Sequence, residues 1–491
     1  MSSHDTGTSL RRLGPIELYC SSRHHMGIYR CVIVTCRYHA LNSQERIDQR
    51  TLYSALGRVI LAQPMLRVGL LRDDTNEASF AHIEKLSLGN HVSFLTLPCQ
   101  SLDEYNEQLA TRQGWHHDQC WLDIAGRPPW RVEVVEPELT EPSGFQDIIF
   151  AFHHSLCDGT SGRLFHEQLL RELNNQSAPS AVEVLEFPQP PQLPDSQDEA
   201  VSFSSSPWFI VKTLWNEFGP SVLRSQKPIP WHGKGIDFSI PYTTRIRPID
   251  VPAAVASKLL GACRQHKTSL TGLIHALVLA SYATRLSADE APFFASITPI
   301  SLRPYLRPGA DASLLRVLVA SLTQEYPPEH VAQLRSGEPT SLDTCIWSTA
   351  QLVKGELSRR ASTLPQDEIV SLMKYIPDWF AFFKAKDGQP RTHSWELSNI
   401  GVFEAPCLAP AAAAAEPASD ARFGVSRMCF TNGAVVAGAP VGLGVASAPN
   451  GLLTIALSWQ QTVVTDDFIA GLANDLLAFV QRFDHTGRFT T

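Results

Sequence analysis

The stretch Phe150-Ala-Phe-His-His-Ser-Leu-Cys-Asp-Gly159 joins a predicted strand to a predicted helix. The nearly continuous apolar run from Asp147 onward is typical of a buried strand. Polar groups at the end of such a strand reach a cleft while the sheet fixes their positions. A histidine there is a natural general base near neutral pH. Asp158 lies within reach of the same turn, and Gly159 allows a backbone conformation that a side chain would forbid. A histidine pair alone would also fit a structural role, but the complete His-His-x-x-x-Asp-Gly string indicates a site.

Strand and helix patterns alternate on both sides of this stretch. A segment at 176–206 rich in Ser, Gln, acidic residues and proline interrupts them, and proline at this density blocks helices and interior strands. The pattern predicts a mixed α/β protein with a first domain at 1–185, a proline-rich crossover at 186–235 and a second domain at 236–491. Strands are expected at 28–38, 64–71, 130–135, 147–153, 293–299, 441–447 and 452–459, and helices at 49–60, 164–173, 255–263, 270–282 and 466–483.

Within the crossover, Trp208, Val211, Trp215 and Phe218 fall on one helical stripe. This stripe fits a helix packed on a domain. A helix that faces a membrane or covers the site as a lid is the alternative.

Composition excludes several classes of protein. The 491 residues exceed what one core usually supports, and 44% hydrophobic with 18% charged residues exclude a wholly disordered chain. A net charge of −8 argues against general binding to nucleic acid or anionic membranes. Ten scattered cysteines without a C-x-x-C pair argue against a disulfide framework and a cysteine zinc site. No apolar leader and no run of 18 apolar residues are visible, so we expect a cytoplasmic protein without a membrane-spanning helix. Loose association with internal membranes or lipid droplets stays open.

The string from His153 to Gly159 resembles the active-site motif of the acyltransferase superfamily that includes chloramphenicol acetyltransferase, the plant BAHD acyltransferases and peptide-synthetase condensation domains. Where the plant branch has Asp-Phe-Gly-Trp-Gly, this chain has Arg422-Phe-Gly-Val-Ser426, which argues against a plant-type enzyme. Further segments, spread over nearly the whole chain, resemble the fungal-type alcohol acetyltransferase branch: Leu13–Glu17 with His24 and His25, Gln63–Leu66, Pro129–Val132, Ser301–Pro304, Trp395–Gly401 and Leu457–Trp459.

The resemblance implies two pseudo-symmetric chloramphenicol-acetyltransferase-like domains with an active-site tunnel at their interface. His154 would be the general base in that tunnel, with acyl-CoA entering from one side and the acceptor from the other. Asp158 would point away from the substrates and pair with Arg303, which would orient the loop, while His153 would be structural. Arg303 otherwise fits a surface arginine before a proline turn. No bound cofactor is implied, because acetyl-CoA or another acyl-CoA acts as co-substrate.

Other candidate residues carry two interpretations each. Ser398 and Asn399 either face the tunnel and help to orient the carbonyl or form a turn before a strand. Cys157 could look like a nucleophile because His154 is nearby, but its position in the motif need not face the tunnel. His116-His117-Asp118 could suggest a metal site, but a solvated turn is the better interpretation because no further ligand is near in sequence, so we expect no metal.

The resulting hypothesis is an O-acyltransferase that transfers acetyl from acetyl-CoA to a hydroxyl of a hydrophobic alcohol or secondary metabolite, with His154 as general base and no acyl-enzyme. Its expected partners are these two small molecules, and a monomer is the expected state. One alternative is a condensation-type catalyst that uses an amine acceptor or a carrier-bound acyl donor. Another is a non-catalytic relic of the fold that binds a small molecule.

Overall fold

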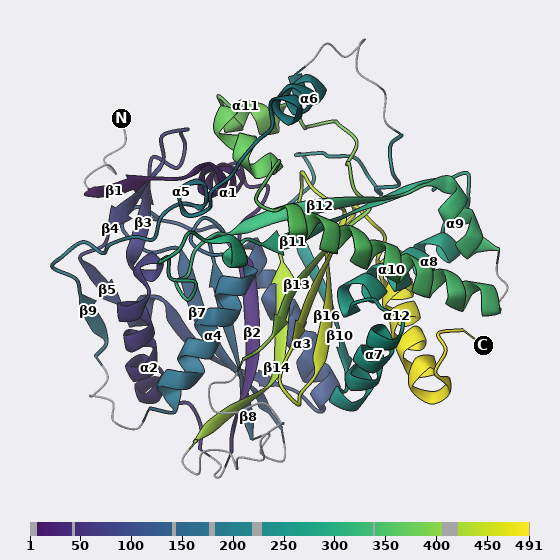
Figure 1. Ribbon diagram of the computed structural model, residues 1–491. Helices are drawn as coiled ribbons and strands as arrows, with labels where there is room; N and C mark the ends of the chain where they lie inside the picture. Colours follow the sequence, from purple (N-terminus) through teal and green to yellow (C-terminus); the bar gives the residue numbers. More distant parts are fainter. Residues whose placement is uncertain are drawn as a thin grey trace.

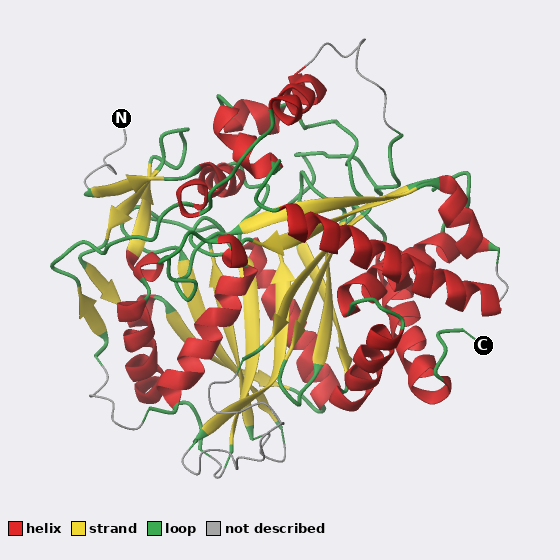
Figure 2. Cartoon of the chain, viewed as in Figure 1, coloured by secondary structure: helices red, strands yellow, loops and turns green. Residues whose placement is uncertain are grey.

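The computed structural model describes residues 7–41, 45–139, 144–175, 182–218, 228–336, 339–404 and 421–490. Two large β-sheets run through the centre of the molecule, and helices cover their outer faces (Figures 1 and 2). The predicted mixed α/β class is therefore confirmed.

The first sheet is built almost entirely from the N-terminal part of the chain. All its neighbouring strands are antiparallel except the parallel pair β6 and β7. Its strand order is β14 (Phe423–Asn432), β2 (Val32–Ala40), β8 (Phe145–Phe152), β7 (Trp130–Glu138) and β6 (Val92–Pro98).

Alternating side chains of this sheet face two different layers of helices. Val34 and Phe150 lie in a core with α2 (Gln49–Ala62) and α4 (Gly159–Leu173). Ile33 and Ile149 lie in a smaller core with α3 (Leu102–Asp118). Because both faces are covered, the central strands β2 and β8 are buried along nearly their whole length.

The second sheet comes from the C-terminal part of the chain and mixes parallel and antiparallel pairs. The strands β11, β13 and β15 run parallel to one another, and their remaining neighbours run antiparallel. Its order is β10 (Thr244–Val251), β16 (Leu453–Gln460), β15 (Val441–Ser447), β13 (Trp395–Val402), β11 (Phe294–Ser301) and β12 (Val319–Tyr326). The helices of this part are α7 (Ala253–Gln265), α8 (Leu270–Arg285), α9 (Pro328–Arg335), α10 (Pro339–Thr363) and α12 (Asp466–Thr486).

The two sheets meet where β14 and β15 lie side by side. Although β14 comes late in the chain, it pairs with β2 and forms an edge of the first sheet. A side chain at Gly444 on β15 would collide with the backbone carbonyl of Phe430 on β14, so only glycine allows this approach. The proposed boundaries at 185 and 235 stay a prediction, and residues 423–432 belong structurally to the first sheet.

Smaller elements close the upper side of the molecule in the view of Figure 1, where α6 and α11 lie next to each other. They include a three-stranded sheet of β1, β4 and β3, while a two-stranded sheet of β5 and β9 lies at the left edge of this view. Their bounds are β1 (Ser9–Arg12), β3 (Val68–Leu71), β4 (Ser79–His82), β5 (Lys85–Ser87), β9 (Val184–Glu186), α1 (Pro15–His25), α5 (Gln197–Ala200), α6 (Pro207–Phe218) and α11 (Trp379–Lys384), with 3-10 turns η1 (Pro64–Arg67), η2 (Leu88–Asn90), η4 (Arg303–Tyr305) and η5 (Ile369–Tyr375).

Each predicted strand and helix is present, but three interpretations of the sequence need correction or extension. The segment expected as a strand at 64–71 begins with the turn η1, because Pro64 starts a 3-10 helix there. The helix α6 does not bury its stripe against a domain: Trp208, Val211 and Trp215 are exposed, while the side chain of Phe218 lies outside the described residues. The long helix α10 had no counterpart in the sequence prediction. Within the described ranges, no helix is both long and apolar enough to span a membrane.

Candidate active site

The loop that carries His154 connects the end of β8 at Phe152 to the start of α4 at Gly159. The Nδ1 atom of His154 lies 2.9 Å from the carbonyl oxygen of Cys157. A carbonyl can only accept, so Nδ1 carries the proton and donates it, which leaves the Nε2 lone pair of a neutral ring free. Burial and the nearby charge of Arg23 lower the pKa of His154 to about 4. The ring is therefore a neutral base at pH 7 and lies against a cavity.

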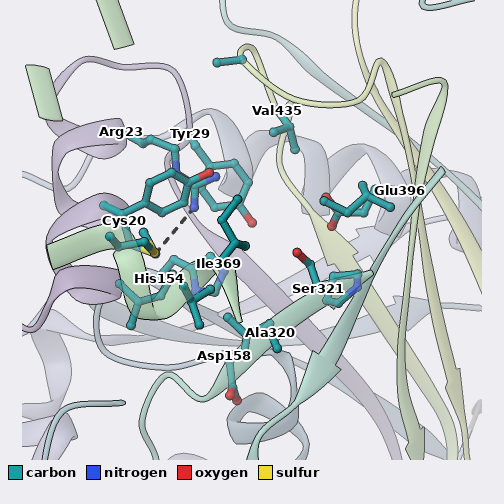
Figure 3. Close-up of a pocket in the computed structure, with 18 of the residues that line it drawn as sticks. Cys20, Arg23, Tyr29, His154, Asp158, Ala320, Ser321, Ile369, Glu396 and Val435 are labelled. Atoms are coloured by element: carbon teal, nitrogen blue, oxygen red, sulfur yellow. Dashed lines mark hydrogen bonds between the residues drawn. The ribbon is translucent and has the colours of Figure 1, made fainter. Parts of the chain in front are cut away.

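Asp158 is fully engaged in holding this loop. One carboxylate oxygen accepts from the backbone N–H of Ser161 at 2.7 Å and caps α4. The other accepts from Arg303 Nη1 at 2.7 Å and from the backbone N–H of Leu318 at 2.9 Å. Burial acts to raise the pKa of Asp158, but Arg303 and these hydrogen bonds outweigh it and hold the pKa below its ordinary value. The carboxylate points away from the His154 ring (Figure 3).

Arg303 ties this loop to the C-terminal part of the chain. Its Nη2 donates to Ser161 Oγ at 2.7 Å and to the backbone carbonyl of Arg316 at 3.3 Å. The pair of Arg303 and Asp158 is largely buried, with exposed side-chain fractions of 10% and 8%. The structure thus places Arg303 at Asp158 and not on the surface. Because one guanidinium donates to Asp158, Ser161 and Arg316, it fixes the position of the loop relative to the second sheet.

His153, the first histidine of the pair, faces the protein interior. Its Nδ1 accepts from the backbone N–H of Ser155 at 3.1 Å and from Ser155 Oγ at 2.7 Å. Its ring packs edge-on against His24 with centroids 4.6 Å apart. Burial, together with the charges of neighbouring side chains, lowers its pKa well below the ordinary value. A neutral ring with these contacts supports the loop and does not reach the cavity.

Gly159 is required by space and not by backbone conformation, which corrects the expectation from the sequence. Its φ does not lie in the left-handed region. A Cβ atom here would lie 2.8 Å from Ile400 Cγ2 and 2.9 Å from the ring of Phe430. Glycine therefore lets the first turn of α4 approach β13 and β14.

The cavity beside His154 has a volume of about 520 Å³ and lies between elements of both halves of the chain. Strands β11, β12 and β13 form one wall, and α1, η5 and α11 form another. The apolar residues that η5, α11 and the segment between them contribute to the lining include Ile369, Leu372, Met373, Ile376, Trp379, Phe382 and Phe383. Polar side chains that line it include Arg23, Tyr29, Ser321, Lys386, His393, Glu396, Ser398 and Asn432.

Ser398 and Asn399 separate in the structure. Both lie on β13, where successive side chains point to opposite faces. Ser398 lines the cavity. Asn399 instead donates from Nδ2 to Thr271 Oγ1 on α8 at 3.0 Å and accepts from the backbone N–H of Gly401. Only Ser398 is placed to contact a bound molecule.

Two further candidates behave differently from a catalytic or metal-binding group. Burial raises the pKa of Cys157 well above its ordinary value, so its thiol stays protonated and is a poor nucleophile. His116 and His117 do not form a solvated turn: they are buried at the end of α3, because Glu133 and Thr431 provide partners for their Nε2 atoms. Across the described ranges, no group of three or more potential ligands could hold a metal ion.

Sequence reasoning did not single out most of the polar residues of the cavity, and three of them lie within or beside the quoted motifs. Arg23 directly precedes His24 and His25 of the N-terminal motif, and Tyr29 lies shortly after them in the sequence. Glu396 lies inside the Trp395–Gly401 motif. Figure 3 places Arg23 and Tyr29 on the same side as His154, with Glu396 across from them. Their positions within or beside quoted motifs were the available signal.

Comparison with known proteins shows a similarity to alcohol acetyltransferases. A family model for alcohol acetyltransferase matches residues 120–311, a range that contains both His154 and Arg303. The probable alcohol acetyltransferase FCK4 of Fusarium pseudograminearum is 26% identical over 487 residues and covers 95% of this chain and 94% of that protein.

Solved structures agree in fold. TRI3 trichothecene 15-O-acetyltransferase from Fusarium sporotrichioides superposes with a TM-score of 0.66 at 11% identity, over 95% of this chain and 96% of the other. The first condensation domain of the calcium-dependent antibiotic synthetase superposes with a TM-score of 0.58 at 13% identity, over 96% of each chain. The family model and the relative from Fusarium pseudograminearum confirm the predicted relationship to the alcohol acetyltransferases, and the solved structures agree with it in fold.

Proposed function

We propose that this chain, an acyltransferase related to the alcohol acetyltransferases, transfers acetyl from acetyl-CoA to a hydroxyl of a largely apolar alcohol or secondary metabolite. The observation that carries the proposal is His154, a neutral imidazole held by its Nδ1 proton against a mainly apolar cavity. Acetyl-CoA would be a co-substrate and no cofactor would stay bound. The enzyme would act as a monomer in the cytoplasm, with the exposed apolar face of α6 as the surface for any loose contact with membranes.

In this mechanism Nε2 of His154 takes the proton of the acceptor hydroxyl as its oxygen attacks the thioester carbonyl carbon. The C–S bond then breaks, the acyl group stays on the acceptor as an ester, and the sulfur of CoA leaves. The imidazolium returns its proton to that sulfur, so the base is regenerated and no acyl-enzyme forms. General-base assistance of this kind contributes roughly 10²–10⁴ in rate.

Asp158 would act as a positioning residue in this scheme. Its carboxylate contacts Arg303, Ser161 and Leu318, and its charge raises the pKa of His154 against the larger effect of burial. Ser398, on the opposite wall, would donate its hydroxyl to a substrate oxygen.

The test is to mix the purified protein with acetyl-CoA and matched panels of primary, secondary and terpenoid alcohols and of the corresponding amines. Thiol release is followed together with product mass. Ester formation supports the proposal, and preference for the amines moves it to a condensation-type reaction. Absence of both thiol release and product with every acceptor overturns acetyl-CoA as donor, and a carrier-bound or longer acyl group is tried next.

A further inference from the structure

Arg23 is a buried cation that lacks a carboxylate partner. It lies in the last turn of α1 with 8% of its surface exposed, and it lines the cavity. Within the described part of the chain, its only side-chain hydrogen bond is from Nη2 to Cys20 Sγ at 3.6 Å, and it forms no ion pair. Its Nε–H is buried and has no partner. A guanidinium offers five N–H donors, so most of this donor capacity is unused in the protein alone.

Two aromatic rings hold the guanidinium in place. Its central carbon lies 4.1 Å from the ring centroid of Tyr19 and 4.5 Å from that of Tyr29. The ring of Tyr29 also lies 5.7 Å from the ring of His154. Arg23 and the proposed base are therefore separated by a single aromatic ring, and Figure 3 shows both on the same side of the cavity.

A hydrogen-bonded series continues from Tyr29 to the opposite wall. The Tyr29 hydroxyl donates to Asn432 Oδ1 at 2.9 Å, and Asn432 Nδ2 donates to Glu396 Oε1 at 3.3 Å. Burial raises the pKa of Glu396, and the charge of Arg23 opposes that shift. The cavity thus has a hydrogen-bond donor with positive charge on one side and a carboxyl group across from it.

Two apolar side chains of the lining lie close to the rings that hold Arg23. Trp379 and Phe383 of α11 pack on Tyr19, with ring centroids 5.2 and 5.4 Å from it, and both line the cavity. A molecule that fits this space is mainly hydrocarbon but carries an oxygen that can accept from Arg23. A plain hydrocarbon alcohol would leave the guanidinium without a partner, which is costly for a buried charge.

We propose that Arg23 binds a carbonyl-type oxygen of the acceptor, a few bonds away from the hydroxyl that His154 deprotonates. The acceptor class is then a hydroxy ketone, hydroxy lactone or hydroxy acid with an apolar body, and Arg23 is a specificity-determining residue. This inference rests on the proposed function, because it takes the cavity beside His154 as the acceptor site.

The test uses three ten-carbon probes: decan-4-ol, 4-hydroxydecan-2-one and 3-hydroxydecanoate. Their binding is measured by calorimetry without any acyl donor, and their kcat/KM values are measured with acetyl-CoA. We expect 4-hydroxydecan-2-one to bind about 10-fold more tightly than decan-4-ol, as a hydrogen bond to a buried charged donor provides. The 3-hydroxydecanoate arm distinguishes a carboxylate from a neutral carbonyl as the preferred oxygen.

Arg23→Met keeps the length of the side chain and removes its donors, so the preference for the hydroxy ketone should fall to about 1-fold. Arg23→Lys keeps the charge without the planar fork and should retain part of the preference. Arg131→Met is the matched control, because it removes an arginine that stacks on Trp121 and is not among the residues that line the cavity, and the preference should stay. Circular dichroism confirms that each variant is folded.

An unchanged preference in folded Arg23→Met overturns the inference. The inference is also overturned if Arg23→Met lowers kcat/KM equally for all three probes while their binding stays unchanged. Arg23 would then act on the transferred acyl group. A preference in binding without ester formation by any probe contradicts the proposed function but retains the site at Arg23. Ester formation without any preference in wild type retains the function and removes the site.

Discussion

The loop that carries His154 and the part of α1 that carries Arg23 line the same cavity, but their charged groups are paired in opposite ways. In the loop, each charge has partners: Asp158 and Arg303 hold each other, and Asp158 also accepts from two backbone N–H groups. On the wall, Arg23 is buried with a single weak hydrogen bond to sulfur. A buried ion pair suits a group that must stay in one geometry, whereas a buried cation with most of its donors unused suits a surface that binds a ligand.

The comparison predicts very different costs when a charge is removed from either region. Asp158→Ala leaves Arg303 buried without its carboxylate, and we expect the free energy of unfolding to fall by about 3–5 kcal/mol. Urea denaturation measures this change. If Asp158→Ala is nearly as stable as wild type, the pair does not anchor the loop.

Acidification tests the neutral state of the buried histidines in and around the loop. Burial lowers the pKa of His24 to about 3 and those of His154 and His166 to about 4. The unfolded chain therefore binds more protons than the folded protein once pH falls below about 6.5. Stability is fully present above that pH and declines towards pH 4, by up to about 1.4 kcal/mol per pH unit for each such histidine. Urea midpoints at pH 7.5 and 5 measure the effect, and equal midpoints would contradict neutral buried rings.

Gly159 tests whether the close approach of the loop to β13 and β14 matters. Gly159→Ala places a methyl group against Ile400 and Phe430, and overpacking of this kind costs about 1–3 kcal/mol. Gly261→Ala in α7 is a matched control, because its Cβ would meet nothing within 4 Å. The control should be more stable by about 0.5–1 kcal/mol, since alanine is the better helix residue. Thermal unfolding compares the two, and equal shifts would show that space at Gly159 is not limiting.

The smallest expected change in stability is at Arg23, in the wall of the cavity that α1 forms. Arg23→Met loses two contacts with aromatic rings, but it also removes a buried charge that forms no ion pair within the described residues. The free energy of unfolding should therefore change by less than about 1 kcal/mol. Urea denaturation of Arg23→Met and Asp158→Ala under the same conditions compares the two losses of stability directly. A loss as large as that of Asp158→Ala would mean that Arg23 is a structural residue.

The sequence was most informative where function and local structure coincide. His154 and Asp158 lie in one turn between a strand and a helix, so contiguous residues sufficed to predict them. Arg303 is 145 positions from Asp158, and only the family resemblance brought the two together. The exchange of β14 into the first sheet depends on a pairing with β2 between segments at opposite ends of the chain, for which no local pattern exists.

The errors also have physical causes. Three polar residues in succession at 116–118 suggested solvent, but the histidines are buried because Glu133 and Thr431 provide partners from other elements. The stripe of α6 suggested a packed face, yet Trp208 and Val211 remain exposed. The facing positions of Arg23 and Glu396 could not be predicted, since they arise only when α1 and β13 line one cavity.

The most direct test of the central claim is the rate of ester formation by His154→Ala beside wild type, with an acceptor found active in the alcohol panel. The variant should keep its circular dichroism and its binding of the acceptor, because His154 makes only one hydrogen bond within its own loop. Ester formation should fall by roughly 10²–10⁴. A folded variant that retains wild-type turnover would contradict the assignment of His154 as the general base.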